Sequence, residues 1–236
     1  MEFAFVASSR RDRLTPRKRP VQARSEATVA ALFEASIQVL LAVGYRKLTT
    51  TRVAERAGVS VGTLYQYFPN REALINSVIK GYLDEVVSSI ERSCQDLDGQ
   101  RLEELATGLA DAFIAAKYKR IDVSRAMHEP LADVGGAELV KTAATRAAGF
   151  IANNLQSCRN ASFRDVPLLA LLIVMACSSL LQTAIADQTG LVNANALRGH
   201  MRAMVLGYLR EAQQATECSH DEAHPKASLM SRSVGS

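Results

Sequence analysis

Apolar residues recur at helical spacing from about residue 25 onward. Intervals of three and four residues place them on one face of a helix, as expected when one side packs against a core. Ser25 is suited to cap the start of this helix, and Gly44 is suited to end it after Val43. The pattern therefore predicts a helix over residues 25–43. The positions on its buried face are Leu32, Ala35, Ser36, Val39, Leu40 and Val43.

Further helical patterns follow along the chain. Two are short, at 50–57 and 61–67, and Asn70 is suited to cap a long helix that begins at residue 71. Because no alternating strand pattern of useful length occurs, the predicted fold class is all-α. The helices after residue 70 are predicted at 71–93, 101–118, 119–128, 137–159, 165–187 and 195–215.

One uncharged segment, Val166–Ala186, has 21 residues and is long enough to cross a bilayer. No second span and no aromatic belt accompany it, and it contains several polar residues and a proline. A helix that the protein itself buries over most of its surface is the better interpretation, and no membrane partner is expected. The polar and proline positions are Pro167, Ser178, Ser179, Gln182 and Thr183.

Charge is unevenly distributed. Residues 1–75 hold 12 Lys and Arg against 6 Asp and Glu, whereas residues 76–236 hold 16 against 18. A basic first third indicates that a polyanionic partner binds there. Residues 1–24 have no apolar period and read as a basic disordered arm, which either contacts DNA or is a solvated tail without a role. Residues 217–236 are also predicted to be disordered.

The four cysteines, Cys94, Cys158, Cys177 and Cys218, form no C-x-x-C pair and lie in no His cluster. Neither a disulfide framework nor a metal site is therefore predicted, and no cofactor is expected. Reduced thiols fit a cytoplasmic protein. The sequence also lacks a nucleophile–base set, a phosphate-cradling Gly loop and a metalloprotease motif, so no catalytic residue is assigned and an enzyme is not expected.

Residues 50–69 have the features of a helix-turn-helix. Ala54 is small enough to sit where two short helices cross, and Gly58 suits a turn that needs positive φ. Ser60 can cap the second helix, so that its start is well defined. Apolar faces that would attach the pair to the first helix are supplied by Val53, Ala57, Val59 and Leu64.

The composition of the second short helix suggests contacts to DNA. Its small first turn can approach base edges in a major groove, and Gln66 can pair with adenine, although a plain surface role stays open for it. Tyr65, Tyr67 and Arg71 are expected to reach phosphates, with a core position as the alternative for Tyr67. Thr50 can offer its hydroxyl to another phosphate. The full predicted set is Thr50, Thr51, Arg52, Val61, Gly62, Thr63, Tyr65, Gln66, Tyr67 and Arg71.

At these residues the chain resembles the TetR family of bacterial transcriptional regulators, densely over residues 25–75. The resemblance implies a helix-turn-helix DNA-binding domain at 25–75 and a helical ligand-binding and dimerisation domain at 76–216. It also implies a homodimer through the helices near 165–187 and 195–215. The matching motifs are Gly44-Tyr45, Thr49-Thr50, Val53-Ala54, Ala57-Gly58-Val59-Ser60, Gly62-Thr63-Leu64-Tyr65, Tyr67-Phe68 and Arg71-Glu72-Ala73-Leu74.

The resulting hypothesis is a repressor that leaves a palindromic, double-stranded DNA operator when a small-molecule effector binds its helical core. A TetR-like DNA-binding protein controlled by a protein partner, without a small-molecule inducer, is the alternative. The sequence does not identify the effector. Residues suggested to line its pocket are Phe113, Tyr118, Met127, His128, Phe150, Asn154, Met175 and Gln182.

Overall fold

The computed structural model describes residues 23–187 and 194–221, and every α-helix or 3-10 helix in it falls within these ranges, with no strand among them. The predicted all-α class is confirmed. In chain order the elements are α2 (Ala23–Val43), η1 (Tyr45–Lys47), α3 (Thr50–Ala57), α4 (Val61–Tyr67), α5 (Arg71–Gln95), α6 (Leu102–Tyr118), α7 (Ile121–Ala126), α8 (His128–Asp133), α9 (Ala137–Gln156), α10 (Val166–Ala186) and α11 (Ala194–Asp221).

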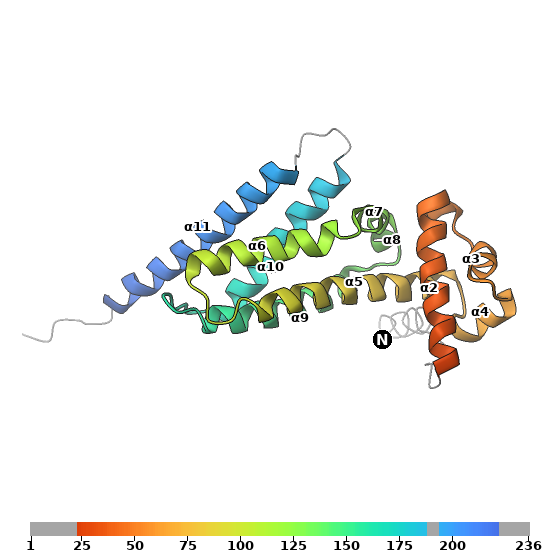
Figure 1. The fold of residues 1–236 in the computed structure, drawn as a ribbon, viewed down its shortest axis with the longest axis horizontal. Helices are drawn as coiled ribbons and strands as arrows, with labels where there is room; N and C mark the ends of the chain where they lie inside the picture. Colours follow the sequence, from red (N-terminus) through yellow and green to blue (C-terminus); the bar gives the residue numbers. More distant parts are fainter. Residues whose placement is uncertain (1–22, 188–193, 222–236) are drawn as a thin grey trace, which may run out of the picture.

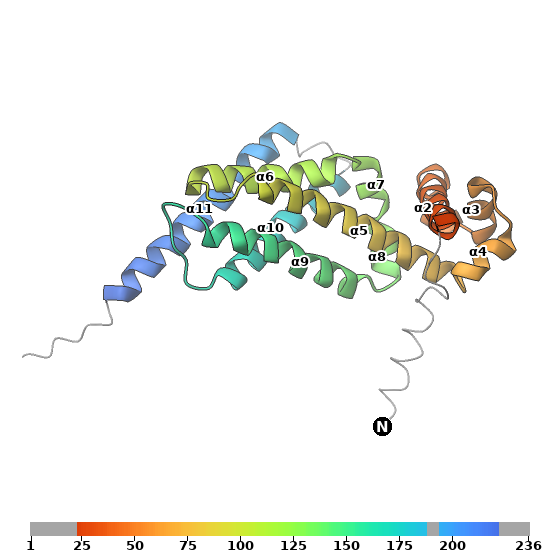
Figure 2. The same ribbon diagram turned by 60° about the horizontal axis from the view of Figure 1, so that its bottom comes forward.

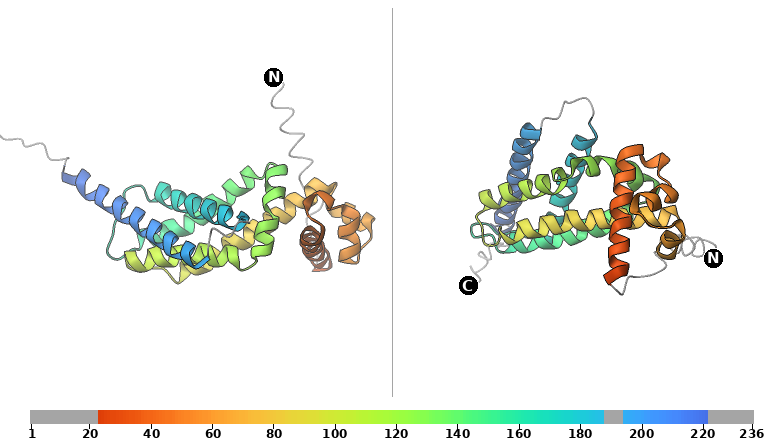
Figure 3. Two further views of the ribbon diagram at one scale, coloured as in Figure 1. Left: turned by 90° about the horizontal axis from the view of Figure 1, so that it is seen from above. Right: turned by 45° about the vertical axis from the view of Figure 1, so that its right-hand side comes forward.

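The helices form an elongated molecule with the three N-terminal ones at one end (Figure 1). From there α5 runs into the body of the protein, where it packs between α6 and α9. The helix α10 packs along α9, and α11 lies against α6 on the far side (Figures 2 and 3). The small helices α7 and α8 lie where the body meets the N-terminal helices. They are therefore placed between the two parts of the molecule.

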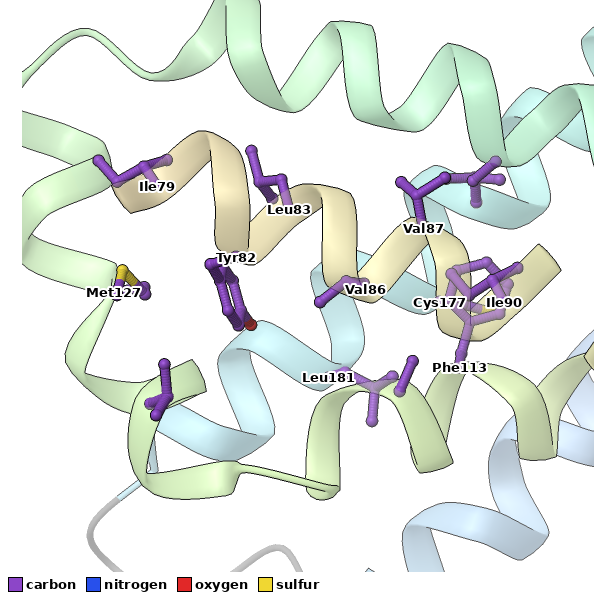
Figure 4. Close-up of a cluster of buried hydrophobic side chains, with 14 of the residues drawn as sticks. Ile79, Tyr82, Leu83, Val86, Val87, Ile90, Phe113, Met127, Cys177 and Leu181 are labelled. Atoms are coloured by element: carbon purple, nitrogen blue, oxygen red, sulfur yellow. The ribbon is translucent and has the colours of Figure 1, made fainter. Parts of the chain in front are cut away.

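A single continuous core runs through both parts, and α5 supplies its middle. Near its start α5 buries Leu74 and Ile75, which belong to the same cluster as Leu64 and Phe68 of the α4 region. Further along it buries a second series against the body, shown in Figure 4. That series comprises Ile79, Tyr82, Leu83, Val86, Val87 and Ile90. Because α5 contributes to both ends of this core, a shift of α5 in the body also moves the contacts that it makes with the N-terminal helices.

Two helices are long and apolar enough to cross a membrane, Ser25–Val43 and Val166–Ala186, judged by length and composition within the described residues. The sequence predicted burial over most of the surface of α10, but only 39% of this helix is buried; its packed face includes Ile173, Cys177 and Leu181. The opposite face leaves Leu168 and Met175 exposed, at 50% and 55% of their surface. Packing within one chain therefore leaves part of the apolar surface of α10 exposed.

The last helix, α11, is held on α6 by charge and by apolar contact. Arg202 donates to Asp111 from both Nε and Nη2, a bidentate arrangement that fixes both side chains. Met201, Val205 and Leu209 point inward and are buried. Gly199 and Gly207 have open space where a Cβ would be, and Tyr208 beside Gly207 is 38% exposed.

Several predicted boundaries were wrong. The first helix begins at Ala23, so Ser25 does not cap it but lies inside it. The helix predicted at 119–128 is two short helices that meet at Met127. The predicted disordered tail from 217 is also wrong at its start, because α11 continues to Asp221. The basic arm predicted over 1–24 and the rest of the tail lie almost wholly outside the described residues.

Candidate nucleic-acid interface and effector cavity

The turn between α3 and α4 has the geometry that the sequence predicted. Gly58 has φ 68° and ψ 29°, a left-handed conformation that glycine adopts without strain. Its N–H donates to the carbonyls of Ala54 and Glu55 and ends α3. Ser60 then accepts a hydrogen bond from the Thr63 N–H at 3.0 Å and starts α4. The C-terminus of α3 and the N-terminus of α4 thus both have capping hydrogen bonds from nearby residues, so the angle between these two helices is determined locally.

The helix α4 is anchored on one side and open on the other. Leu64 is fully buried, and Phe68 just beyond the helix is 1% exposed. Gly62, Tyr65 and Gln66 are exposed, whereas Val61, Thr63 and Tyr67 are partly buried. Since Gly62 and Gln66 are four residues apart, they share one face of the helix. That face carries no bulky apolar residue and is free to enter a groove.

Side chains from α3 extend the exposed surface. Thr50 at the start of α3 shares a hydrogen bond of 3.1 Å with the Tyr65 hydroxyl. Thr51 and Arg52 are exposed beside it, and Arg52 Nη1 donates to the Lys47 carbonyl at 2.7 Å. The N-terminus of α3 and the middle of α4 therefore present hydroxyl and guanidinium groups side by side. A phosphate can be bound by this combination.

The expected outward projection of Arg71 was wrong. Its guanidinium points into the domain, where Nε donates to the Leu48 carbonyl at 2.9 Å and Nη2 donates to the Tyr45 carbonyl at 2.7 Å. It also lies over the Tyr45 ring, 4.3 Å from the centroid. Since α3 begins just after Leu48, Arg71 ties the start of α5 to the segment that leads into α3. Its donors are used inside the protein.

Two further side chains lie in positions that the sequence analysis did not fully predict. Tyr67 is partly buried, and its hydroxyl accepts a hydrogen bond from Ser25 at 3.2 Å, so it bridges α4 and α2. The sequence analysis overlooked Lys47, which is exposed and forms no ion pair within the described ranges. Its place in a basic pair just before Thr49 was a signal that could have found it.

Two side-chain contacts join η1 to α8, Tyr45 with Asp133 and Arg46 with Glu129, and together they form a clasp between these segments. The Tyr45 hydroxyl donates to Asp133, and Arg46 pairs with Glu129 at 3.0 Å. Burial and the hydrogen bond to Asp133 raise the pKa of Tyr45 to about 12, against the opposing effect of Arg71. The phenol is therefore protonated at neutral pH and serves as a donor. Through this clasp the N-terminal helices touch the body at a point other than α5.

A cavity of about 260 Å³ lies in the body between α5, α6, α7, α8, α9 and α10. Four of the eight residues that the sequence suggested line it, namely Phe113, His128, Met175 and Gln182. His128 and Gln182 share a hydrogen bond of 3.0 Å. The other four do not line it, and the residues that sequence reasoning missed include Tyr82, Lys117 and Ser124. A lone lysine near a helix end gives no sequence signal for a cavity position.

The four predicted residues outside the cavity have structural positions. Met127 is 1% exposed at the junction of α7 and α8. Asn154 is 3% exposed and donates from Nδ2 to the Cys94 carbonyl at 2.9 Å, so it ties α9 to α5. Tyr118 and Phe150 are partly buried and pack against the core. Apolar character alone could not separate these positions from lining ones.

Two family models match the chain, one for each part of the fold. Residues 32–78 match a model described as bacterial regulatory proteins of the tetR family. Residues 102–209 match one described as the tetracyclin repressor-like C-terminal domain. The chain belongs to the TetR family. The TetR models thus include the helix-turn-helix and the helices from α6 to most of α11, and the family and its named relatives are transcriptional regulators, not enzymes.

Similar proteins agree with this assignment. The HTH-type transcriptional repressor KstR2 of Rhodococcus jostii is 30% identical over 86 residues, which are 34% of this chain and 37% of that repressor. The chain thus matches little more than a third of the length of this curated relative. A TetR-family regulator from Mesorhizobium loti superposes with a TM-score of 0.63 at 18% identity, covering 80% of this chain and 98% of the other. FadR of Bacillus halodurans, described as a fatty acid degradation regulator, has a TM-score of 0.58 at 19% identity and covers 82% of this chain and 98% of its own. These two likenesses show the fold.

Proposed function

We propose that this TetR-family chain is a transcriptional repressor that binds a palindromic DNA operator as a homodimer and is released by a small molecule. The observation that carries the proposal is α4, a short helix buried through Leu64 and open on the face of Gly62 and Gln66. Residues 25–75 act as the DNA-binding domain and residues 76–216 as the effector and dimerisation domain.

In the proposed complex, α4 lies in the major groove. Val61, Gly62 and Thr63 form its first turn, where close approach to base edges needs small side chains. Gln66 reads a base, while Thr50 and Tyr65, already hydrogen-bonded to each other, contact a phosphate. The two copies of α4 in the dimer would read half-sites about one DNA turn apart, ~34 Å.

The dimer forms through the outer faces of α10 and α11. Leu168, Leu172 and Met175 leave 50%, 39% and 55% of their surfaces exposed on α10. On α11, Gly199 and Gly207 have nothing within 4 Å of a Cβ position, so another helix can approach there. An exposed apolar face on α10 and open positions on α11 are suited to pack against their own copies in a four-helix interface.

The effector acts through α8, which touches both the cavity and the N-terminal helices. His128 and Leu131 line the cavity, and Glu129 and Asp133 on the same short helix hold Arg46 and Tyr45. A ligand that moves α8 therefore changes the clasp and with it the spacing of the two α4 helices. Since coupling is reciprocal, DNA and effector weaken each other's binding by the same factor.

The DNA-binding part of the proposal is tested by selecting duplexes from a random-sequence pool with the full-length protein. The selected site should be an inverted repeat, and its affinity should fall by about three to five decades between about 50 and 200 mM salt if ~6–10 phosphates are neutralised. The Gly58→Val variant is the control, because a β-branched residue resists the positive φ of the turn. Failure to enrich any sequence, or equal enrichment by the variant, would contradict the proposal.

The coupling is tested with Tyr45→Phe, which removes the hydroxyl that holds Asp133 and keeps the ring under Arg71. Operator affinity without effector should change little, and effector affinity should stay the same. The factor by which effector weakens operator binding should fall. If that factor is unchanged, the clasp does not transmit the signal, and α5 and the contact between α2 and α7 are left as the links.

A further inference from the structure

The cavity carries one ammonium group that has no counter-charge. Among the described residues that line it, Lys117 and His128 are the basic ones and no Asp or Glu occurs. The remaining lining is mainly aliphatic and includes Leu83, Ile90 and Val174. Lys119, two residues further on, pairs with Glu85 at 3.4 Å. Lys117 forms no such pair within the described ranges.

The ammonium of Lys117 is nevertheless held in place. Its Nζ donates to the Tyr82 hydroxyl at 3.2 Å and lies 5.1 Å from the centroid of the Tyr82 ring. The Tyr82 hydroxyl donates to Ser124 Oγ at 2.9 Å, and Ser124 Oγ donates to the Lys117 carbonyl at 2.8 Å. This closed chain of hydrogen bonds joins α5, α6 and α7. It uses one of the three N–H donors of the ammonium and leaves the others for a further acceptor.

The Lys117 ammonium and the Tyr82 hydroxyl lie at one end of the cavity, whose remaining lining is mainly apolar. Tyr82, Val86 and Ile90 line the cavity from α5, and Figure 4 shows them following one another along that helix with Phe113 near Ile90. Tyr82 thus lies at the end near α7, whereas Ile90 and Phe113 lie further along. The volume of about 260 Å³ is near the lower end of the range for small-molecule pockets, ~300–1,000 Å³. A ligand of modest size with one polar end fits this distribution.

We infer that the effector is an amphipathic carboxylate. Its carboxylate accepts hydrogen bonds from the Lys117 ammonium, and its apolar body extends along α5 toward Ile90 and Phe113. A carboxylate paired with an ammonium in an apolar cavity makes charge-assisted hydrogen bonds, which are stronger than neutral ones. The assignment of this ligand as the effector rests on the function proposed above, whereas the assignment of the site does not.

The head group and Lys117 make up the regulatory end of the site. Ser124, which closes the chain of hydrogen bonds, belongs to α7, and α7 leads through Met127 into α8. A carboxylate bound to the remaining N–H donors weakens the hydrogen bond from the ammonium to the Tyr82 hydroxyl, which is itself bonded to Ser124 of α7, and thereby changes the packing of α7 and the position of α8. The same group that selects the ligand is therefore placed to report its presence.

The experiment is isothermal titration of the full-length protein with three probes that share one tail: decanoate, 1-decanol and decyltrimethylammonium. Decanoate should bind about ten- to a hundredfold more tightly than 1-decanol, the range for a hydrogen bond to a charged group. The cationic probe should not bind. A fourth probe, 1-naphthoate, distinguishes a flexible acyl carboxylate from a rigid ring carboxylate.

The matched variants are Lys117→Met and Lys119→Met. Both remove an ammonium near the end of α6, so a role in stabilising that helix end would affect both alike. Only Lys117→Met should abolish the preference for decanoate over 1-decanol while binding of 1-decanol persists, which shows that the variant is folded. If the preference survives in Lys117→Met, or if neither carboxylate binds the parent protein, the inference is wrong.

The same probes separate this inference from the proposed function. Decanoate that binds through Lys117 without weakening operator affinity would leave the site assignment standing and contradict the repressor mechanism. Operator release by 1-decanol as strong as that by decanoate would support the mechanism and overturn the carboxylate assignment.

Discussion

Replacing Arg71 with alanine should destabilise the N-terminal helices rather than remove a DNA contact. The guanidinium donates to two backbone carbonyls, of Leu48 and Tyr45, at 2.9 and 2.7 Å. Hydrogen bonds that involve a charged group contribute about 1.5–3 kcal/mol each, and the partial exposure of Arg71 favours the lower end. The stacking on Tyr45 adds about 0.5–1 kcal/mol. Allowing for water that replaces part of these contacts, Arg71→Ala should lose about 2–4 kcal/mol of unfolding free energy.

Two further variants make this result specific. Arg71→Lys keeps the charge, but a single ammonium does not reproduce the planar fork, so it should recover only part of the loss. Arg46→Ala removes a neighbouring arginine whose side chain is 90% exposed and whose ion pair with Glu129 is on the surface. Such pairs contribute about 0–1 kcal/mol, so this variant should stay close to the parent.

The assay is urea unfolding at a fixed chain concentration, followed by far-ultraviolet circular dichroism, together with operator titrations at two salt concentrations. A structural role predicts a lower unfolding midpoint for Arg71→Ala and an unchanged slope of affinity against salt for the folded fraction. A phosphate contact predicts the reverse, namely parental stability and a slope smaller by about one unit per site. The second pattern would refute the structural assignment and restore the role that the sequence suggested.

Three other outcomes are expected. Gln66→Ala should change the preference at one base pair of each half-site by ~1–3 kcal/mol in titrations of single-base operator variants, and a uniform loss would assign it to the backbone. Leu172→Arg should give a folded monomer in sedimentation, because the Leu172 side chain is 39% exposed. Leu181→Arg should unfold the chain, because Leu181 is fully buried. A dimer of parental affinity for Leu172→Arg would contradict the proposed interface. Burial raises the pKa of Cys94 from 9.0 to about 11 and that of Cys177 from 9.0 to about 12, so these thiols ionise at lower pH in the unfolded chain than in the folded one. The free energy of unfolding, measured in urea titrations, should therefore fall above pH ~9 by at most ~1.4 kcal/mol per pH unit per thiol. A free energy that stays constant up to pH ~11 would be inconsistent with this burial.

The helix-turn-helix was accessible from sequence because its determinants are local. The left-handed turn at Gly58 and the cap at Ser60 depend on residues within four positions along the chain. The inward orientation of Arg71 depends on η1, more than twenty residues away in sequence, and no local pattern encodes that contact. Ser25 was misassigned for the same reason, because the helix starts earlier and the hydroxyl reaches Tyr67 instead.

Only half of the residues predicted from sequence to line the cavity do so. Met175 and Gln182 lie on a helix that was predicted from its uncharged, apolar run, but which face looks inward depends on how α10 packs on α9. Lys117 could not be found at all, because its significance comes from the absence of a carboxylate in the space around it. Such a feature is a property of the packed helices and not of any segment.

The account stands on α4 occupying the major groove in two copies, and hydroxyl-radical footprinting of the selected duplex tests this most directly. The protein bound at near-physiological salt should protect two regions on one face of the DNA, with centres about one helical turn apart, ~34 Å. The Gly58→Val variant should protect neither. A single protected region, protection without that spacing, or the same footprint from the variant would contradict the proposed reading of DNA by this helix.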